Sequence, residues 1–170
     1  MLAQAVPSAR RIAILWDPTF DQHKVTMPWI EAAAQKLAVT LQLAPARTAD
    51  EFDAAFAAMD RAHAEAVVAL NSSLTYSHRA RLGDLAREHR LPSMINYADA
   101  GGLFSYMPDI KAMFRQCAGY VDKILKGAKP SDLPVQRPTK IDLIVDLKIA
   151  KTLGITIPPS ILARADDVIE

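Results

Sequence analysis

Polar and aromatic residues that could hold a small ligand follow three short apolar runs of the sequence. Asp17 and Thr19 come after the first run, Asn71 and Ser72 after the second, and Tyr97 after the third. Carboxylate, amide and hydroxyl groups bind polar solutes, and a tyrosine offers a flat apolar face beside a hydroxyl. We therefore interpret these residues as candidate ligand-binding residues.

Each of these three segments also has a purely structural interpretation. Asp17 followed by Pro18 is typical of a turn, and the Asn-Ser-Ser cluster at residues 71–73 is typical of a helix N-cap. Tyr97 could simply cover the edge of a sheet. Convergence favours a site, because three polar loops that meet at one place indicate a binding cleft more strongly than any loop does alone.

The sequence lacks the patterns of common catalytic and metal sites. Its histidines, His23, His63, His78 and His89, form no pair at i, i+4 spacing, so a metal site is not supported and we expect all four at the surface. No serine stands in a Gly-x-Ser-x-Gly motif, and the glycines form no phosphate-binding motif. Cys117 lies on the apolar face of a predicted helix, where we expect core packing. We therefore expect a protein that is not an enzyme and needs no cofactor.

Composition is that of an ordinary globular domain. The chain has 170 residues, of which 51% are hydrophobic and 23% charged. Twenty Lys and Arg against 19 Asp and Glu leave a net charge of +1, and these charges are scattered, so nucleic-acid binding has no support. No apolar run approaches the roughly 18 residues of a membrane-spanning helix.

The elements that must position the candidate residues alternate along the chain. Short apolar runs predict strands, and apolar residues at helical spacing predict the helices between them. The predicted strands are residues 12–16, 39–43, 66–70, 93–96 and 103–106, and the predicted helices begin near residues 26, 52 and 82. This alternation predicts an α/β fold with a doubly wound parallel sheet. Ligands bind beyond the carboxyl ends of strands in such sheets, where the candidate residues stand.

A long amphipathic segment and a proline-rich connection follow these elements. Residues 110–125 keep one face apolar over about four turns, and Gly127 is placed to end that helix. Residues 129–138 are interrupted by prolines, which predicts an extended crossover. A strand at 141–145, a short helix capped by Asp146, and a last short helix near 160–165 complete the prediction.

Several ordered segments resemble a known family. Residues 101–106, 120–135 and 138–159 strongly resemble the C-terminal part of the ABC transporter substrate-binding protein family, which includes tryptophan-binding members. Residues 5–18 look like the start of the second lobe of that family. The resemblance therefore covers essentially the whole chain.

The resemblance implies one lobe of a type I periplasmic-binding-protein fold with crossover segments. Residues 1–100 would be a ligand-binding α/β lobe, the second lobe of the family. Residues 101–135 would be a crossover strand and a long helix that packs on an absent first lobe, and residues 136–170 a return strand with C-terminal helices. The unpartnered apolar face of 110–125 would then favour self-association.

The resemblance also implies a function. The chain would be a solute-binding component of an ABC importer, or a truncated fragment of one, that binds a small molecule such as an amino acid without catalysis and delivers it to a permease. One alternative is a single-lobe sensory or interaction module that acts as a dimer, and another is a small α/β enzyme that uses Asp17, Asn71 and Tyr97. The family implies a periplasmic location, whereas the sequence as written has no signal peptide and would be cytoplasmic if translated from Met1.

Overall fold

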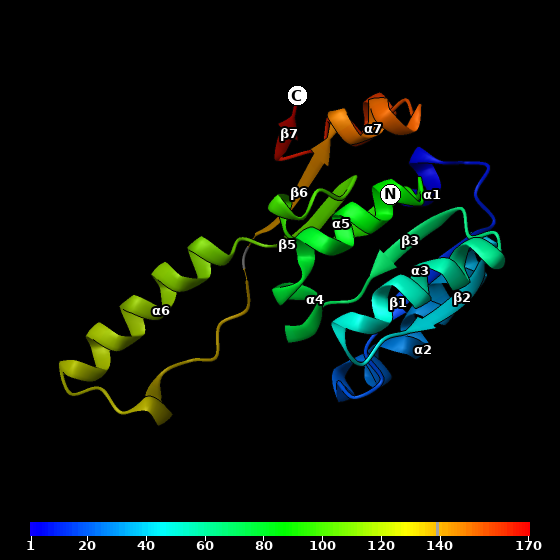
Figure 1. Cartoon of the computed structure of the whole chain (residues 1–170). Helices are drawn as coiled ribbons and strands as arrows, with labels where there is room; N and C mark the ends of the chain where they lie inside the picture. Colours follow the sequence, from blue (N-terminus) through cyan, green and yellow to red (C-terminus); the bar gives the residue numbers. More distant parts are fainter. Residues whose placement is uncertain (139) are drawn as a thin grey trace. The chain divides into compact units, whose positions relative to one another are not determined.

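The computed structural model describes residues 1–138 and 140–170 (Figure 1). Residue 139, within the predicted return segment 136–170, lies outside the described residues. Two units are distinguished, one made of Met1–Tyr106 with Leu143–Glu170 and the other of Met107–Asp142. The first unit carries the candidate residues.

The described residues form a seven-stranded sheet with the strand order β2-β1-β3-β4-β5-β6-β7. Its strands are β1 (Arg11–Trp16), β2 (Thr40–Pro45), β3 (Ala66–Ala69), β4 (Ser93–Ile95), β5 (Phe104–Pro108), β6 (Ile141–Asp146) and β7 (Asp167–Ile169). β1 pairs in parallel with β2 and β3, β3 with β4, β4 with β5, and β6 with β7. β6 is antiparallel to β5. The N–H of Asp146 donates to the carbonyl of Leu103, and the N–H of Asp109 donates to the carbonyl of Lys140.

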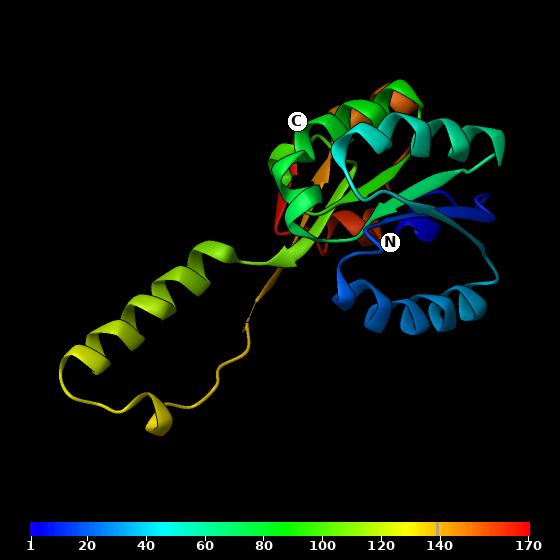
Figure 2. The ribbon, with the colours of Figure 1, turned by 60° about the horizontal axis from the view of Figure 1, so that its bottom comes forward.

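Helices α3 (Phe52–Arg61) and α5 (Arg79–Glu88) cover one face of the sheet (Figure 2). Their large apolar side chains are at most 1% exposed and include Phe52, Phe56, Met59, Leu82 and Leu85. They pack in one cluster with strand residues such as Leu15 and Val67. The helix predicted to begin near residue 52 is therefore confirmed.

The opposite face is covered by α1 (Leu2–Ala5), α2 (Asp21–Leu37), α7 (Leu147–Leu153) and α8 (Pro159–Leu162). Met27 of α2, Ile149 of α7 and Ile161 of α8 share a buried cluster with Ile14 and Val145 of the strands. Helices thus lie on both faces, as a doubly wound sheet requires. The predicted fold class is confirmed.

Two elements differ from the prediction. Helix α2 begins at Asp21 instead of near residue 26, so Pro28 lies inside it. This is tolerated because Pro28 and Lys24 are both exposed, and water can hydrate the Lys24 carbonyl that loses its helical donor. Strand β7 was not predicted, since its three residues are too short for a clear alternating pattern.

The short helix predicted after Asp146 is confirmed, whereas the last helix spans Pro159–Leu162 instead of residues near 160–165. The Asp146 carboxylate accepts a hydrogen bond from the N–H of Ile149 at 2.9 Å and so caps α7. Gly154 ends that helix with a φ of 70°, a conformation that glycine adopts readily.

The second unit carries α6 (Ile110–Leu125) and the short η3 (Pro130–Asp132). The Asp109 carboxylate caps α6 by accepting from the N–H of Ala112 at 2.9 Å. No residue of α6 is buried; Phe114 is 72% and Leu125 82% exposed. Cys117 is exposed as well, so its expected burial in a core is wrong, because the apolar face on which it lies is uncovered.

Candidate functional site

The candidate residues follow three neighbouring strands. β1, β3 and β4 are adjacent and parallel, so their carboxyl ends meet at one edge of the sheet. Helix α2, which follows β1, covers one face, whereas α5, which follows β3, covers the other. The chain therefore leaves the sheet in opposite directions beside β1 and β3, and such a switch point forms a crevice for ligands in α/β sheets.

Asp17 lies at this switch point and is only 7% exposed. Its Oδ1 accepts hydrogen bonds from the N–H of Thr19 at 2.8 Å and from the Thr19 hydroxyl at 2.6 Å. Its Oδ2 accepts none from the described residues, and no described cation forms an ion pair with this carboxylate. One oxygen thus makes the predicted turn, and the other makes no hydrogen bond within the described residues.

His23 connects the first loop to the second. Its Nδ1 lies 2.9 Å from the backbone nitrogen of Asp17, and its Nε2 lies 2.7 Å from the carbonyl oxygen of Asn71. The side chain is 3% exposed, so the expectation that all four histidines lie at the surface is wrong for His23. Helix α2 begins early enough to place this residue in its first turn, facing the strand ends.

The side chains of Asn71 and Ser72 make different contacts. The Ser72 hydroxyl accepts from the N–H of Thr75, and the Thr75 hydroxyl accepts from the N–H of Ser72 at 2.8 Å, which forms a capping box for α4 (Ser73–Ser77). Ser72 is therefore engaged by the cap. The Asn71 side chain is exposed and makes no hydrogen bond within the described residues, so its amide is available to a solute.

Tyr97 belongs to an aromatic and charged cluster. Its ring centroid lies 4.8 Å from that of Tyr76, a residue of α4. The Arg79 guanidinium lies 4.8 Å from the centre of the Tyr76 ring and holds the Asp99 carboxylate through three hydrogen bonds, of 2.9, 3.1 and 2.7 Å. These bonds lower the pKa of Asp99, while burial and then the neighbouring Tyr76 raise the pKa of Tyr97.

The backbone of Tyr97 adopts a conformation that is rare for a residue with a side chain. Its φ is 95°, and its N–H donates to the hydroxyl of the buried Ser105 at 3.0 Å. Unfavourable backbone angles of this kind persist where the surroundings fix them, often at ligand sites. β5, the strand that contains Ser105, therefore holds the aromatic side chain at the carboxyl edge.

The structure thus brings the predicted residues into two linked groups. His23 joins the loops of Asp17 and Asn71, and the cap at Ser72 starts the helix that carries Tyr76 towards Tyr97. Sequence reasoning missed His23, Tyr76 and Arg79. An earlier start for α2 would have placed His23 near Asp17, whereas the pairing of Tyr76 with Tyr97 depends on contacts between distant segments.

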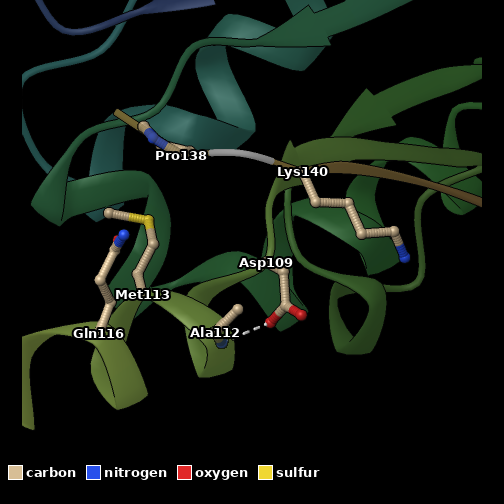
Figure 3. A pocket seen from close by; sticks show the side chains of 6 residues that line it. All are labelled: Asp109, Ala112, Met113, Gln116, Pro138 and Lys140. Atoms are coloured by element: carbon tan, nitrogen blue, oxygen red, sulfur yellow. Dashed lines mark hydrogen bonds between the residues drawn. The ribbon is translucent and has the colours of Figure 1, made fainter. Parts of the chain in front are cut away.

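The described residues also form hollows that none of the candidate residues line. A cavity of about 120 Å³ at the start of α6 is lined by Asp109, Met113, Pro138 and Lys140. Figure 3 shows the Asp109 carboxylate directed at the N–H of Ala112, so this acid serves the helix cap. Among the described residues no cluster of His, Cys, Asp or Glu could hold a metal ion, and no helix there is long and apolar enough to cross a membrane.

Comparison with known proteins decides the family. The family model described as ABC transporter substrate binding protein matches residues 1–169. The chain belongs to this family. No curated protein matches this chain.

Solved structures share the fold of this ABC transporter substrate-binding family member. A conserved domain protein from Vibrio cholerae is 25% identical, with a TM-score of 0.87 over 98% of this chain and 57% of its own. An ABC domain in complex with L-Trp from Streptococcus pneumonia is 24% identical, with a TM-score of 0.88 over 99% of this chain and 58% of its own. A ligand-free, open substrate binding protein with adhesive properties from Clostridium difficile is 20% identical, with a TM-score of 0.68 over 99% of this chain and 57% of its own.

The chain therefore spans somewhat more than half the length of these solved proteins.

Proposed function

We propose that this chain is the ligand-binding lobe of a solute-binding protein of an ABC importer, and that its solute is an amino acid with an aromatic side chain. The observation that carries the proposal is the Asp17 carboxylate, which is 7% exposed and paired with no described cation. A carboxylate in this position has lost much of its contact with water and has gained no opposite charge from the described residues. The ammonium group of an amino acid would supply that charge at Oδ2.

The aromatic cluster supports the side-chain part of this proposal. Tyr76 is 48% exposed and lies against Tyr97, so an aromatic surface is open to a flat apolar group. The Arg79 charge is already matched by Asp99 and stays close to the ring. The structurally similar protein from Streptococcus pneumonia was solved with L-Trp, which makes L-tryptophan the first solute to test.

The remaining parts of the proposal follow from the family. We expect the solute to be bound without catalysis and passed to an ABC permease, and we expect the protein to act in the periplasm. Residues 1–100 would form the ligand-binding lobe, 101–135 the crossover, and 136–170 the return segment. The exposed face of α6, with Phe114 and Leu125, would pack on a second lobe.

Calorimetric titration with L-tryptophan tests the proposal. Asp17→Asn keeps an oxygen that can accept from Thr19 but removes the charge, so affinity should fall at least about tenfold. Asp21→Asn is the matched control, because Asp21 lies four residues further on and pairs only with Lys24 on the surface. Equal affinities for the wild type and Asp17→Asn would contradict a role for Asp17 in binding the ammonium group.

A second candidate function is a dimeric interaction module. It is favoured by one observation, the exposed apolar residues of α6, which include Phe114, Val121, Ile124 and Leu125. Light scattering of the purified chain would reveal a dimer that persists on dilution. Phe114→Lys should dissociate this dimer, whereas Lys111→Ala, on the same helix, should not.

A further inference from the structure

We propose that His23 is a positioning residue that ties the loop after β1 to the loop after β3 and so sets the geometry of the solute site. The inference rests on the proposed function, because it assigns to His23 the alignment of Asp17 and Asn71. The ring is 3% exposed and lies between backbone groups of the two loops. It makes its contacts from α2, outside both loops.

The contacts of the ring favour one of its two neutral tautomers. The N–H of Asp17 lies 2.9 Å from Nδ1 and can only donate, whereas the carbonyl oxygen of Asp17 lies further from Nδ1, at 3.2 Å, so the closer contact favours a lone pair on Nδ1. The carbonyl of Asn71, 2.7 Å from Nε2, can only accept, so Nε2 must carry the proton. Both contacts are satisfied together by the neutral ring with its proton on Nε2. The other neutral form would leave a lone pair facing the Asn71 oxygen.

Two contacts with Phe20 also hold the His23 ring in place. The N–H of His23 donates to the carbonyl of Phe20 at 2.9 Å, which places the residue in the first turn of α2. The Phe20 ring meets the imidazole edge-on, with centroids 5.0 Å apart and planes at 84°. The imidazole therefore has little freedom to follow one loop without the other.

The two loops carry the groups that we assign to the solute. The loop after β1 carries Asp17, whose Oδ2 makes no hydrogen bond within the described residues, and the loop after β3 carries Asn71, whose side-chain amide makes none there either. Neither His23 nitrogen is available to a solute, since both are used by the protein. His23 thus acts through its neighbours: a displacement of the ring alters the distance between Asp17 and Asn71.

Two conservative variants each keep one of the two hydrogen bonds of the His23 ring and remove the other. In His23→Asn the side-chain oxygen occupies the place of Nδ1 and can accept from Asp17, but it cannot reach Asn71. In His23→Gln the longer amide can donate to the Asn71 carbonyl but loses the bond to Asp17. His63→Asn is the control, because His63 is exposed and Asn readily adopts its φ of 54°.

Amide hydrogen exchange of the full chain tests the link without a solute. If His23 couples the loops, each variant should raise the exchange rates of residues 17–20 and 71–73 together, by about 2- to 10-fold, the range that corresponds to one lost hydrogen bond. His63→Asn should leave both loops unchanged. A rise confined to 71–73 in His23→Asn and to 17–20 in His23→Gln would overturn the coupling.

Titration with L-tryptophan, well below the melting temperature of every variant, tests the consequence for binding. A positioning role predicts a several-fold loss of affinity in both variants at a temperature where each variant is folded. Unchanged affinity with a lowered melting temperature would show that His23 is only structural. Failure of the wild type itself to bind L-tryptophan would instead contradict the proposed solute, and hydrogen exchange would still decide the role of His23.

Discussion

The ring of Tyr76 lies 4.8 Å from the ring of Tyr97, with their planes inclined by 53°. The two residues come from different segments, α4 after β3 and the loop after β4. Aromatic pairs at this separation are favourable beyond the area they bury. The contact therefore joins the second and third polar loops, as His23 joins the first and second.

The backbone of Tyr97 leads to the first prediction. Because φ is 95°, any residue with a Cβ is strained there, whereas glycine is not. Tyr97→Ala and Tyr97→Gly both remove the ring, so the difference between their stabilities reports the effect of the backbone conformation alone. We expect the glycine variant to be more stable by about 1 kcal/mol in urea unfolding. A more stable alanine variant would mean that Tyr97 is not strained.

The Arg79 and Asp99 pair predicts a dependence on pH. The hydrogen bonds from Arg79 hold the pKa of Asp99 below its ordinary value of 3.8 in the folded chain. The unfolded chain therefore takes up this proton first as pH falls. The stability that the pair adds is present above the ordinary value and is lost as pH falls through the lowered one.

This second prediction is measured by comparing the wild type with Asp99→Asn. At neutral pH the variant should be less stable by under about 1 kcal/mol, because the Asp99 side chain is 64% exposed. Well below pH 3.8 the two proteins should unfold at the same urea concentration. A difference that persists in acid would rule out the charge as its source.

Two glycines in helices predict opposite effects of the same substitution. A Cβ on Gly83 of α5 would lie 1.6 Å from the backbone oxygen of Ala100, whereas one on Gly119 of α6 would meet nothing within 4 Å. Gly119→Ala should stabilise α6 by about 0.5–1 kcal/mol through helix propensity. Gly83→Ala should destabilise the chain and displace the segment that follows Tyr97. Thermal unfolding measures both, and a stabilising Gly83→Ala would show that the two segments are not in close contact.

Two phenylalanines test which apolar residues form the core. Phe56 is 1% exposed in the cluster beneath α3 and α5, while Phe114 on α6 is 72% exposed. Phe56→Ala should cost about 3–5 kcal/mol of unfolding free energy. Phe114→Ala should change it by less than about 0.5 kcal/mol. A large loss from Phe114→Ala would show that the face of α6 is covered in solution.

Most of the fold was predictable because local signals agreed with the final packing. The apolar runs of β1 and β3 are short and end at polar residues, and residues 110–125 form α6 with the predicted bounds. The start of α2 was missed because Pro28 indicated a first turn, while the contacts of His23 with Asp17 and Asn71 favour the longer helix. The burial of Cys117 was wrong because a periodic apolar face does not show what covers it.

The site was only partly predictable for a similar reason. Asp17, Asn71 and Tyr97 stand at strand ends, a position that follows from the order of elements alone. The sequence could not separate Ser72 from Asn71, because the capping box depends on where α4 begins. The links made by His23, Tyr76 and Arg79 arise from tertiary contacts, which no local spacing indicates.

The most direct test of the account maps L-tryptophan on the isotope-labelled chain by amide chemical shifts. The account predicts that the shifted residues cluster at 17–23, 71–76 and around Tyr97, at the carboxyl edge of β1, β3 and β4. Shifts confined to α6, or to the amino ends of the strands near Arg10 and Glu65, would contradict the proposed site.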